Sequence, residues 1–256
     1  HGGEPGHVDA VTAWLERIDC SEDDLECGGH PPAHAPSAEA LLRAGGTVRP
    51  VHNNCSGKHA GYLTLARHLG HPTAGYVRFE HPVQQRVLAI VEELTGLKLA
   101  SAPRGIDGCG VPVFGVPLAK LALAMARFGR PDGLPRRRSA AAIRIRRTMA
   151  AHPFMVAGTS RFCTAVLQAL GPSICIKTGA EGMFMGALPE PGLGFALKIL
   201  DGAGRAAEVA TLRLLDRLGV IGDGPRRRLA RFAPAPVTNR AGRVVGEIRA
   251  AADCPF

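Results

Sequence analysis

Hydrophobic residues recur at helical spacing through most of the first 170 positions. The clearest case is 81–96, where Pro82 stands in the first turn, apolar residues follow one face and Gly96 ends the pattern. The same spacing predicts further helices at about 5–19, 38–44, 115–129, 139–151, 160–170 and 205–219.

Another helix is predicted directly after the stretch NNCSGKH at 53–59. Its inner face is expected to carry Tyr62, Leu65 and Leu69, and Gly70 is expected to end it.

The pattern changes to short apolar runs after residue 171. These runs predict strands at 173–179, 182–189, 192–202 and 243–250, with the sequence PEPG as the hairpin turn between the second and third. Helices followed by a hairpin and a closing helix are typical of an α+β fold with an antiparallel sheet flanked by helices. We therefore expect one domain over 1–256, with a helical part at about 1–171 and the sheet and closing helix at about 172–256.

Composition narrows the class of protein. The 256 residues are 46% hydrophobic with a mean hydropathy of +0.05, and no apolar run is long enough for a membrane span. The net charge is +9, but only five of the 31 basic residues are lysine, many arginines lie in loop-like runs, and aromatic residues are 5% of the chain. We therefore expect no nucleic-acid partner and no membrane. Seven irregularly spaced cysteines favour reduced thiols and a cytoplasmic location.

The stretch NNCSGKHAG at 53–61 is the first candidate for chemistry. Cys55, Lys58 and His59 lie close together there. Three interpretations stay open: a nucleophile with its base, half of a metal site, or a loop that begins a helix.

A second candidate is GIDGCGVPVF at 105–114. Cys109 stands between two glycines, shortly after Asp107. Glycines on both sides permit close approach of the backbone, which is unusual for a core cysteine. Cys55 and Cys109 are candidates to converge as thiolate ligands of zinc, although their spacing matches no zinc-finger pattern.

A third candidate is IKTGAEG at 176–182, where Lys177 ends an apolar strand and precedes Thr178 and Gly179. A Lys-Thr-Gly on a late strand is similar to the inner-strand motif of serine β-lactamases and penicillin-binding proteins. That chemistry needs a Ser-x-x-Lys, and none of the seven serines has lysine three positions later. The nearest imitation is Cys55 with Lys58.

Together these stretches resemble the asparaginase II family, the rhizobial-type class of L-asparaginases. The resemblance runs in order from about residue 1 to about 200 and is carried by GEPGHVDAV, CGGHPP, NNCSGKHAGYL, HPVQ, GIDGCGVPVFGVPL, HPFMVAGT and KTGAEG. It implies a fold like that of the serine β-lactamases. It also implies hydrolysis of L-asparagine to L-aspartate and ammonia by a serine nucleophile in Ser-Lys tandems, beside a zinc ion.

The resemblance also implies roles for particular residues. By motif, they are Lys177 as the catalytic lysine of the second Ser-Lys pair, His59, Asp107 and Thr178 at the substrate pocket, and Cys55, Lys58 and Cys109 as zinc ligands. Zinc ligation by Lys58 requires a neutral amine, so the resemblance implies a lowered pKa for this side chain.

One departure from the family pattern bears on activity. In the family, both catalytic serines precede the stretch that stands at residue 1 here. We therefore expect that an N-terminal segment is missing and that the chain as printed is inactive.

Three alternatives stay open beside the asparaginase. The first is a related amidase, glutaminase or β-lactam-type hydrolase on the same scaffold, and the second is a catalytically dead zinc-binding protein. The third is a cysteine hydrolase that uses Cys55 with Lys58 or His59 as its base. A homodimer is also considered.

Overall fold

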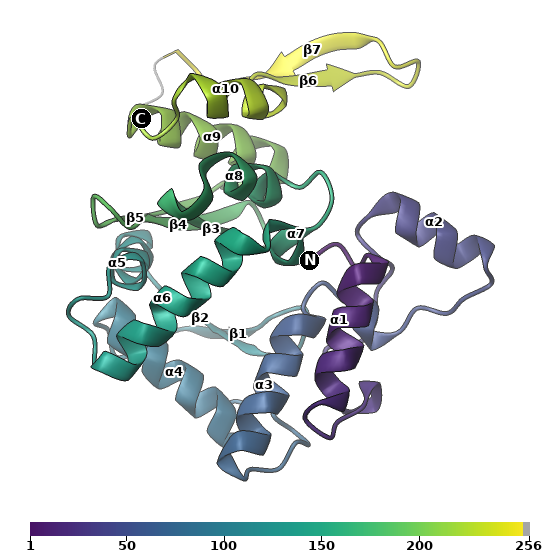
Figure 1. Cartoon of the computed structure of the whole chain (residues 1–256), viewed down its shortest axis with the longest axis vertical. Coiled ribbons are helices and arrows are strands. Elements are labelled where there is room, and N and C mark those ends of the chain that lie inside the picture. Colours follow the sequence, from purple (N-terminus) through teal and green to yellow (C-terminus); the bar gives the residue numbers. More distant parts are fainter. Residues whose placement is uncertain (253–256) are drawn as a thin grey trace. The chain divides into compact units, whose positions relative to one another are not determined.

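The chain forms two compact units, residues 1–116 and 117–256, in a computed structural model that describes residues 1–252 (Figure 1). Both units combine helices with small antiparallel sheets, so the α+β class is confirmed. The boundary between the units lies at 116–117 and not at the change of pattern near 171. The prediction of a single domain concerns how the units associate, and it stays a prediction.

The first unit contains four helices and one short hairpin. Its helices are α1 (Pro5–Glu16), α2 (Ala35–Arg43), α3 (Ser56–Leu69) and α4 (Pro82–Thr95), and its strands are β1 (Arg104–Ile106) and β2 (Pro112–Phe114). α4 begins as its sequence predicts, with Pro82 in the first turn and the His81 ring accepting the Val83 N–H at 3.2 Å. Gly70 and Gly96 end α3 and α4 with positive φ angles of 68° and 71°.

The core of the first unit packs α1 against α3. Val11 and Leu15 of α1 and Leu63 of α3 are buried there with Tyr76 and Cys109.

The buried face of α3 differs from the predicted one. Leu69 is 41% exposed, Tyr62 and Leu65 are half-buried, and the fully buried row runs through Ser56, His59, Ala60, Leu63 and Ala66. The prediction placed His59 at the substrate pocket and did not include it in the inner face of this helix. In the fold, its ring is inside the core because a hydroxyl group satisfies its Nδ1 atom.

The second unit is built around a three-stranded antiparallel sheet in the order β3-β4-β5. Its elements are α5 (Leu118–Gly129), α6 (Arg136–Ala151), α7 (Pro153–Ala157), α8 (Phe162–Leu170), β3 (Cys175–Thr178), β4 (Met183–Leu188), β5 (Leu193–Lys198), α9 (Gly204–Arg217), α10 (Asp223–Leu229), β6 (Ala235–Thr238) and β7 (Val244–Ile248). The predicted hairpin is present, because the PEPG turn connects β4 to β5 and the Gly192 N–H donates to the Pro189 carbonyl at 3.2 Å.

Helices cover both faces of this sheet (Figure 1). On one face, Phe184 of β4 and Phe195 of β5 pack with α8 and α9, and the predicted inward residues Val209, Leu212 and Leu215 of α9 are buried. On the other face, α5 lies directly on β5. A Cβ atom added to Gly194 would lie 2.0 Å from the Ala122 carbonyl oxygen, so only glycine allows this close approach.

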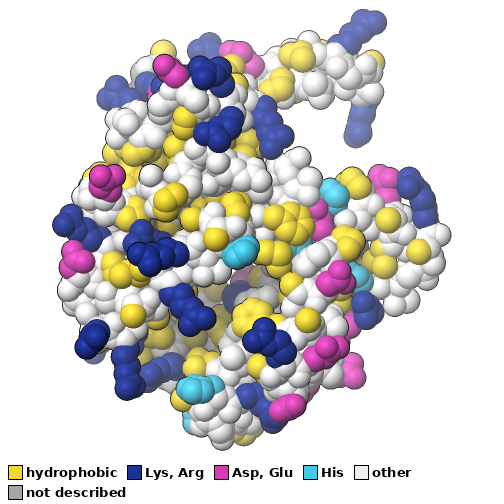
Figure 2. Space-filling model, in the orientation of Figure 1, with side chains coloured by type: hydrophobic (Ala, Val, Ile, Leu, Met, Phe, Trp, Pro, Cys, Tyr) yellow, Lys and Arg dark blue, Asp and Glu magenta, His cyan; other side chains and the backbone are white. Residues whose placement is uncertain are grey.

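The β1–β2 hairpin, α7, α10 and β6 were not predicted. The hairpin strands are only three residues long, and β6 contains Pro236, which weakens a strand pattern. No helix in the described part of the chain has both the length and the apolar character needed to cross a membrane. On the face shown in Figure 2, Lys and Arg side chains are scattered and do not form one continuous patch.

Candidate functional site

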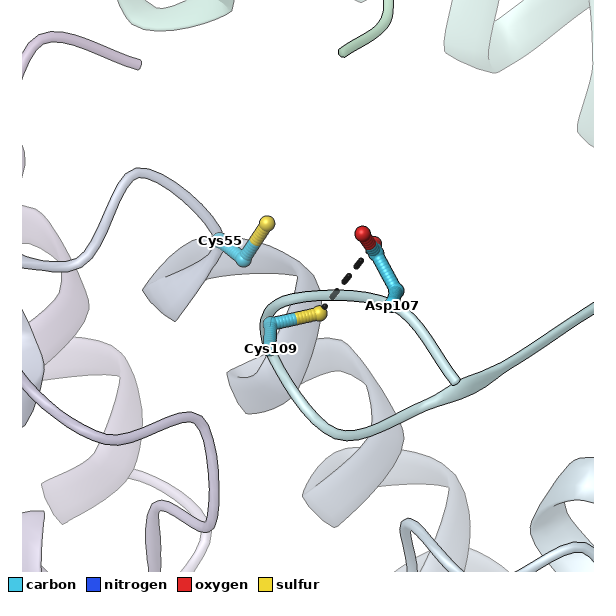
Figure 3. A group of neighbouring side chains, drawn as sticks. All are labelled: Cys55, Asp107 and Cys109. Atoms are coloured by element: carbon cyan, nitrogen blue, oxygen red, sulfur yellow. Dashed lines mark hydrogen bonds between the residues drawn. The ribbon is translucent and has the colours of Figure 1, made fainter. Parts of the chain in front are cut away.

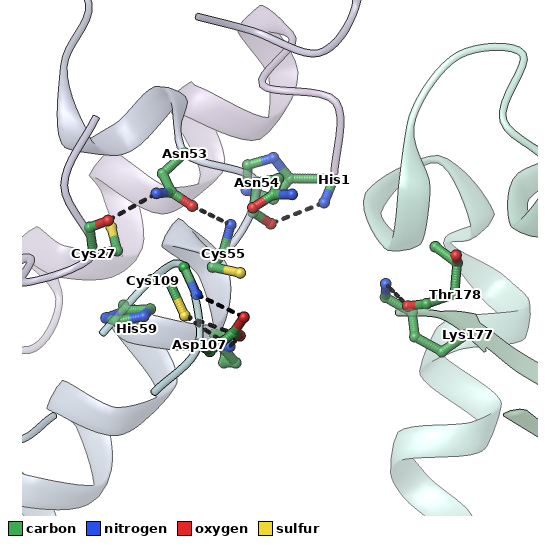
Figure 4. A network of polar contacts seen from close by, with 12 residues as sticks. His1, Cys27, Asn53, Asn54, Cys55, His59, Asp107, Cys109, Lys177 and Thr178 are labelled. Atoms are coloured by element: carbon green, nitrogen blue, oxygen red, sulfur yellow. Dashed lines mark hydrogen bonds and ion pairs between the residues drawn. The ribbon is translucent and has the colours of Figure 1, made fainter. Parts of the chain in front are cut away.

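The N-terminus of α3 presents Cys55 in a fixed orientation. Cys55 is the residue that caps the helix, and its N–H donates to the Asn53 side-chain oxygen at 2.8 Å. The Asn53 amide nitrogen in turn donates to the carbonyl oxygens of Cys27 and Gly28 at 2.9 and 3.0 Å (Figure 4). Asn53 is only 5% exposed, so this buried amide anchors the turn that carries Cys55.

The turn between β1 and β2 presents Asp107 and Cys109. The Asp107 N–H donates to the Val111 carbonyl at 2.8 Å, and the Gly110 N–H donates to the Asp107 carbonyl at 2.8 Å. Gly110 has a φ of +90°, which a residue with a side chain adopts only with strain. The tight turn holds Cys109 at 5% exposure and leaves Asp107 half-buried.

These two segments converge. Potential ligand atoms of Cys55, Asp107 and Cys109 lie within 4.8 Å of one another (Figure 3). Lys58, from the first turn of α3, places its Nζ atom 3.1 Å from the Cys109 sulfur and 3.5 Å from Asp107 Oδ2. We call Cys55, Lys58, Asp107 and Cys109 the thiol cluster. The sequence analysis predicted that Cys55 and Cys109 converge. It placed Asp107 at the substrate pocket and not among the possible metal ligands.

The two thiols of the cluster share one favourable site for a proton. A hydrogen bond from Cys109, with the charge of Lys58, lowers the pKa of Cys55 to about 6 although burial raises it. The same bond with Cys55, together with burial, raises the pKa of Cys109 to about 12. The two shifts therefore belong to the pair, and their directions favour the thiolate at Cys55 and the thiol at Cys109.

The neighbouring thiols also shift the pKa values of Lys58 and Asp107. Burial lowers the pKa of Lys58, but the sulfur atoms of Cys55 and Cys109 raise it more, so its net pKa lies above the ordinary value. Burial raises the pKa of Asp107, but the Gly108 N–H, the Cys109 thiol and Lys58 together hold it below its usual range. Without a metal ion, Lys58 is an ammonium ion between a thiolate and a carboxylate, and not the neutral amine that zinc ligation requires.

Lys177 and Thr178 lie at the end of β3 in the second unit. Lys177 is opposite Met185 in the sheet and exposed, and its Nζ atom donates to the Thr178 carbonyl at 2.9 Å. The Thr178 hydroxyl donates to the carbonyl oxygen of Gly179 at 3.2 Å. These residues and the thiol cluster belong to different units, so their meeting in one cleft stays a prediction.

His59, the third predicted substrate residue, is not at the surface. It is fully buried beneath the thiol cluster, and its Nδ1 atom lies 2.6 Å from the Tyr76 hydroxyl. Tyr76 and Asn53 are the residues that sequence reasoning missed. The doubled asparagine before Cys55 hinted at Asn53, whereas nothing in the sequence around Tyr76 indicates its contact with His59.

Comparison with known proteins agrees with the motifs. A search of curated proteins found no match. A family model described as L-asparaginase II matches residues 1–250, nearly the whole chain. The match does not bear out the expectation that a segment is missing before His1. Because the model covers so much of the sequence, the chain belongs to the L-asparaginase II family.

Proposed function

We propose that this protein hydrolyses L-asparagine to L-aspartate and ammonia. Family membership supports an amidohydrolase of this kind. The observation that carries the proposal within the molecule is the convergence of two thiols, an amine and a carboxylate from α3 and the β1–β2 turn. Buried and half-buried groups of this reactivity rarely gather without a chemical role.

We further propose that the thiol cluster holds a zinc ion. Two sulfurs, a nitrogen and a carboxylate oxygen are donors that zinc accepts, and it prefers four of them. Cys55, Cys109 and Lys58 are the proposed ligands. Since Cys109 and Lys58 are protonated in the metal-free site, binding must release their protons, and affinity should rise with pH. A bound zinc ion would supply a local positive charge that stabilises a negatively charged transition state.

Asp107 is the residue we assign to the α-ammonium group of the substrate. Its carboxylate stays ionised and is half-buried. Its Oδ1 atom accepts the Gly108 N–H at 2.8 Å, and its Oδ2 atom lies 3.4 Å from the Cys109 sulfur and 3.5 Å from Lys58 Nζ. A carboxylate can accept about four hydrogen bonds, so it keeps capacity for a cationic ligand.

We assign Lys177 to the reaction as a partner of a nucleophilic serine. An amide requires an activated nucleophile, and a lysine amine can take its proton only when neutral. The sheet with helices on both faces and a Lys-Thr-Gly on β3 supports a scaffold like that of the serine β-lactamases. The serine of this step is not assigned to a residue, because no serine of the sequence is followed by lysine at the third position.

The test is ammonia release from L-asparagine by the gene product that contains residues 1–256. Lys177→Ala should reduce turnover by about 100- to 10,000-fold, the usual contribution of a general base. Lys198→Ala is the matched control, because Lys198 is also an exposed lysine of this sheet that donates to the next carbonyl. Equal activity of the two variants would contradict the role of Lys177. The same assay tests whether residues 1–256 by themselves release ammonia.

The same assay separates the related hydrolases. Faster turnover of L-glutamine or of a chromogenic β-lactam than of L-asparagine would indicate a glutaminase or a β-lactam-type hydrolase. Zinc binding without any hydrolysis would indicate a binding protein. The cytoplasmic location and the homodimer stay predictions.

A cysteine hydrolase is the second candidate, favoured by the lowered pKa of Cys55. In that case Cys55→Ser should abolish turnover in the presence of excess zinc, and alkylation of Cys55 should block the metal-free enzyme. A zinc-ligand role instead predicts that alkylation fails when zinc is bound.

A further inference from the structure

We infer that His59 is a positioning residue of the thiol cluster. Its Nδ1 atom is locked as an acceptor by Tyr76, and its Nε2–H is thereby directed at the Cys109 sulfur to hold it as a zinc-binding thiolate. This inference rests on the zinc site of the proposed function. It moves His59 from the substrate pocket to a layer behind the metal ligands.

The first step of the argument is the tautomer of His59. The Tyr76 hydroxyl oxygen accepts the Glu26 N–H at 2.9 Å and lies 2.6 Å from His59 Nδ1 (the Tyr76 side chain is fully buried). The hydroxyl proton needs an acceptor, and within the described residues Nδ1 is the one its contacts offer. Nδ1 therefore accepts, so the proton of the neutral ring is on Nε2.

The second step is the surroundings of Nε2. This atom is buried and, within residues 1–252, makes no hydrogen bond of ordinary distance and angle. Figure 4 shows His59 beside Cys109. The buried ring nitrogen without a partner among the described residues therefore lies on the side chain that neighbours Cys109, a proposed zinc ligand.

The third step is energetic. A buried N–H without a partner costs about 1–3 kcal/mol, so its retention requires an explanation. A Cys109 sulfur held as a zinc-bound thiolate would provide one, because a thiolate accepts hydrogen bonds that a thiol accepts poorly. A cysteine that binds zinc is in this thiolate form. Ligands of metal ions commonly depend on such supporting hydrogen bonds.

A direct role in binding substrate or zinc fits His59 less well. Its exposed fraction is zero, and the rings of Tyr62 and Tyr76 meet it edge to face at 5.6 and 5.4 Å. A nitrogen that carries a proton cannot bind zinc. The backbone N–H of His59 donates to the Cys55 carbonyl at 3.0 Å, so His59 follows Cys55 by one helical turn.

Two substitutions separate the nitrogens. The amide nitrogen of His59→Gln reaches the position of Nε2 and keeps a donor toward Cys109, whereas His59→Asn reaches only the position of Nδ1. Zinc affinity is measured on the full chain by competition with a chromogenic chelator. We expect His59→Gln to stay within about threefold of the unaltered protein, and His59→Asn to bind zinc about 10- to 100-fold more weakly.

Nuclear magnetic resonance of protein labelled with ¹⁵N-histidine tests the same point without a substitution. The His59 spectrum should show the proton on Nε2, and the shift of this proton should move when zinc is added. A proton on Nδ1 would overturn the inference even if both variants failed to fold.

The outcomes distinguish this inference from the proposed function. Equally tight zinc binding by His59→Asn and the unaltered protein would overturn the role of His59 alone. If the unaltered protein bound no zinc, the zinc site of the proposed function would be refuted, and the role of His59 with it.

Discussion

Tyr76→Phe removes one oxygen atom from the core of the first unit and little else. The phenyl ring keeps the packing against His59, whereas two hydrogen bonds are lost. His59 Nδ1 is left without a partner in a fully buried position, which costs about 1–3 kcal/mol. The Glu26 N–H is only partly buried and can turn to water, so its loss costs about 1 kcal/mol. We expect the free energy of unfolding to fall by about 2–4 kcal/mol.

Trp14 makes this loss measurable in the first unit alone. It is the only tryptophan, and its indole N–H donates to the Thr64 hydroxyl at 2.9 Å, joining α1 to α3. Urea unfolding followed by its fluorescence therefore reports on the packing around Tyr76. Tyr62→Phe is the control, since the Tyr62 hydroxyl makes no hydrogen bond within the described residues; we expect a change below about 0.5 kcal/mol. An equally small change for Tyr76→Phe would refute the account of the buried hydroxyl.

Three further predictions concern packing, pH and metal. Gly194→Ala should destabilise the second unit by at least about 2 kcal/mol, because the added Cβ would lie 2.0 Å from a backbone oxygen of α5, whereas Gly204→Ala meets open space and should be neutral in thermal unfolding. Burial and nearby Arg49 lower the pKa of His52 in the folded protein. As the pH falls, His52 of the unfolded chain is therefore protonated first, and the stability of the fold should decrease below about pH 6.5. His52→Asn should flatten this pH dependence in thermal melts between about pH 5 and 8. Iodoacetamide should modify Cys55 at pH 7 in metal-free protein and fail to do so with zinc bound, as read by mass spectrometry, whereas half-exposed Cys20 should react equally in both states.

Local sequence signals were sufficient for most elements. Pro82 and Gly96 set the ends of α4, and the PEPG turn identified the β4–β5 hairpin, because capping and turn residues act on the backbone beside them. The β1–β2 hairpin was missed, since strands this short carry no periodic pattern.

Contacts between distant segments were harder to predict. Cys55 and Cys109 could be paired from their chemistry, and the structure brings them together. Tyr76 could not be found in this way, because a single aromatic residue in a turn gives no sign that its hydroxyl supports a histidine from another helix. The buried side of α3 was misjudged for the same reason, as polarity alone does not show whether a buried ring has a partner.

The origins of the two thiols have a consequence for assembly of the first unit. The whole of α3 and the whole of α4 lie between Cys55 and Cys109 along the chain. An ion bound by both sulfurs would close this stretch into a loop. It would lower the conformational entropy of the unfolded chain, as a reversible cross-link does. Removal of the metal should then lower the melting temperature that Trp14 fluorescence reports for the first unit more than it lowers the melting temperature of residues 117–252.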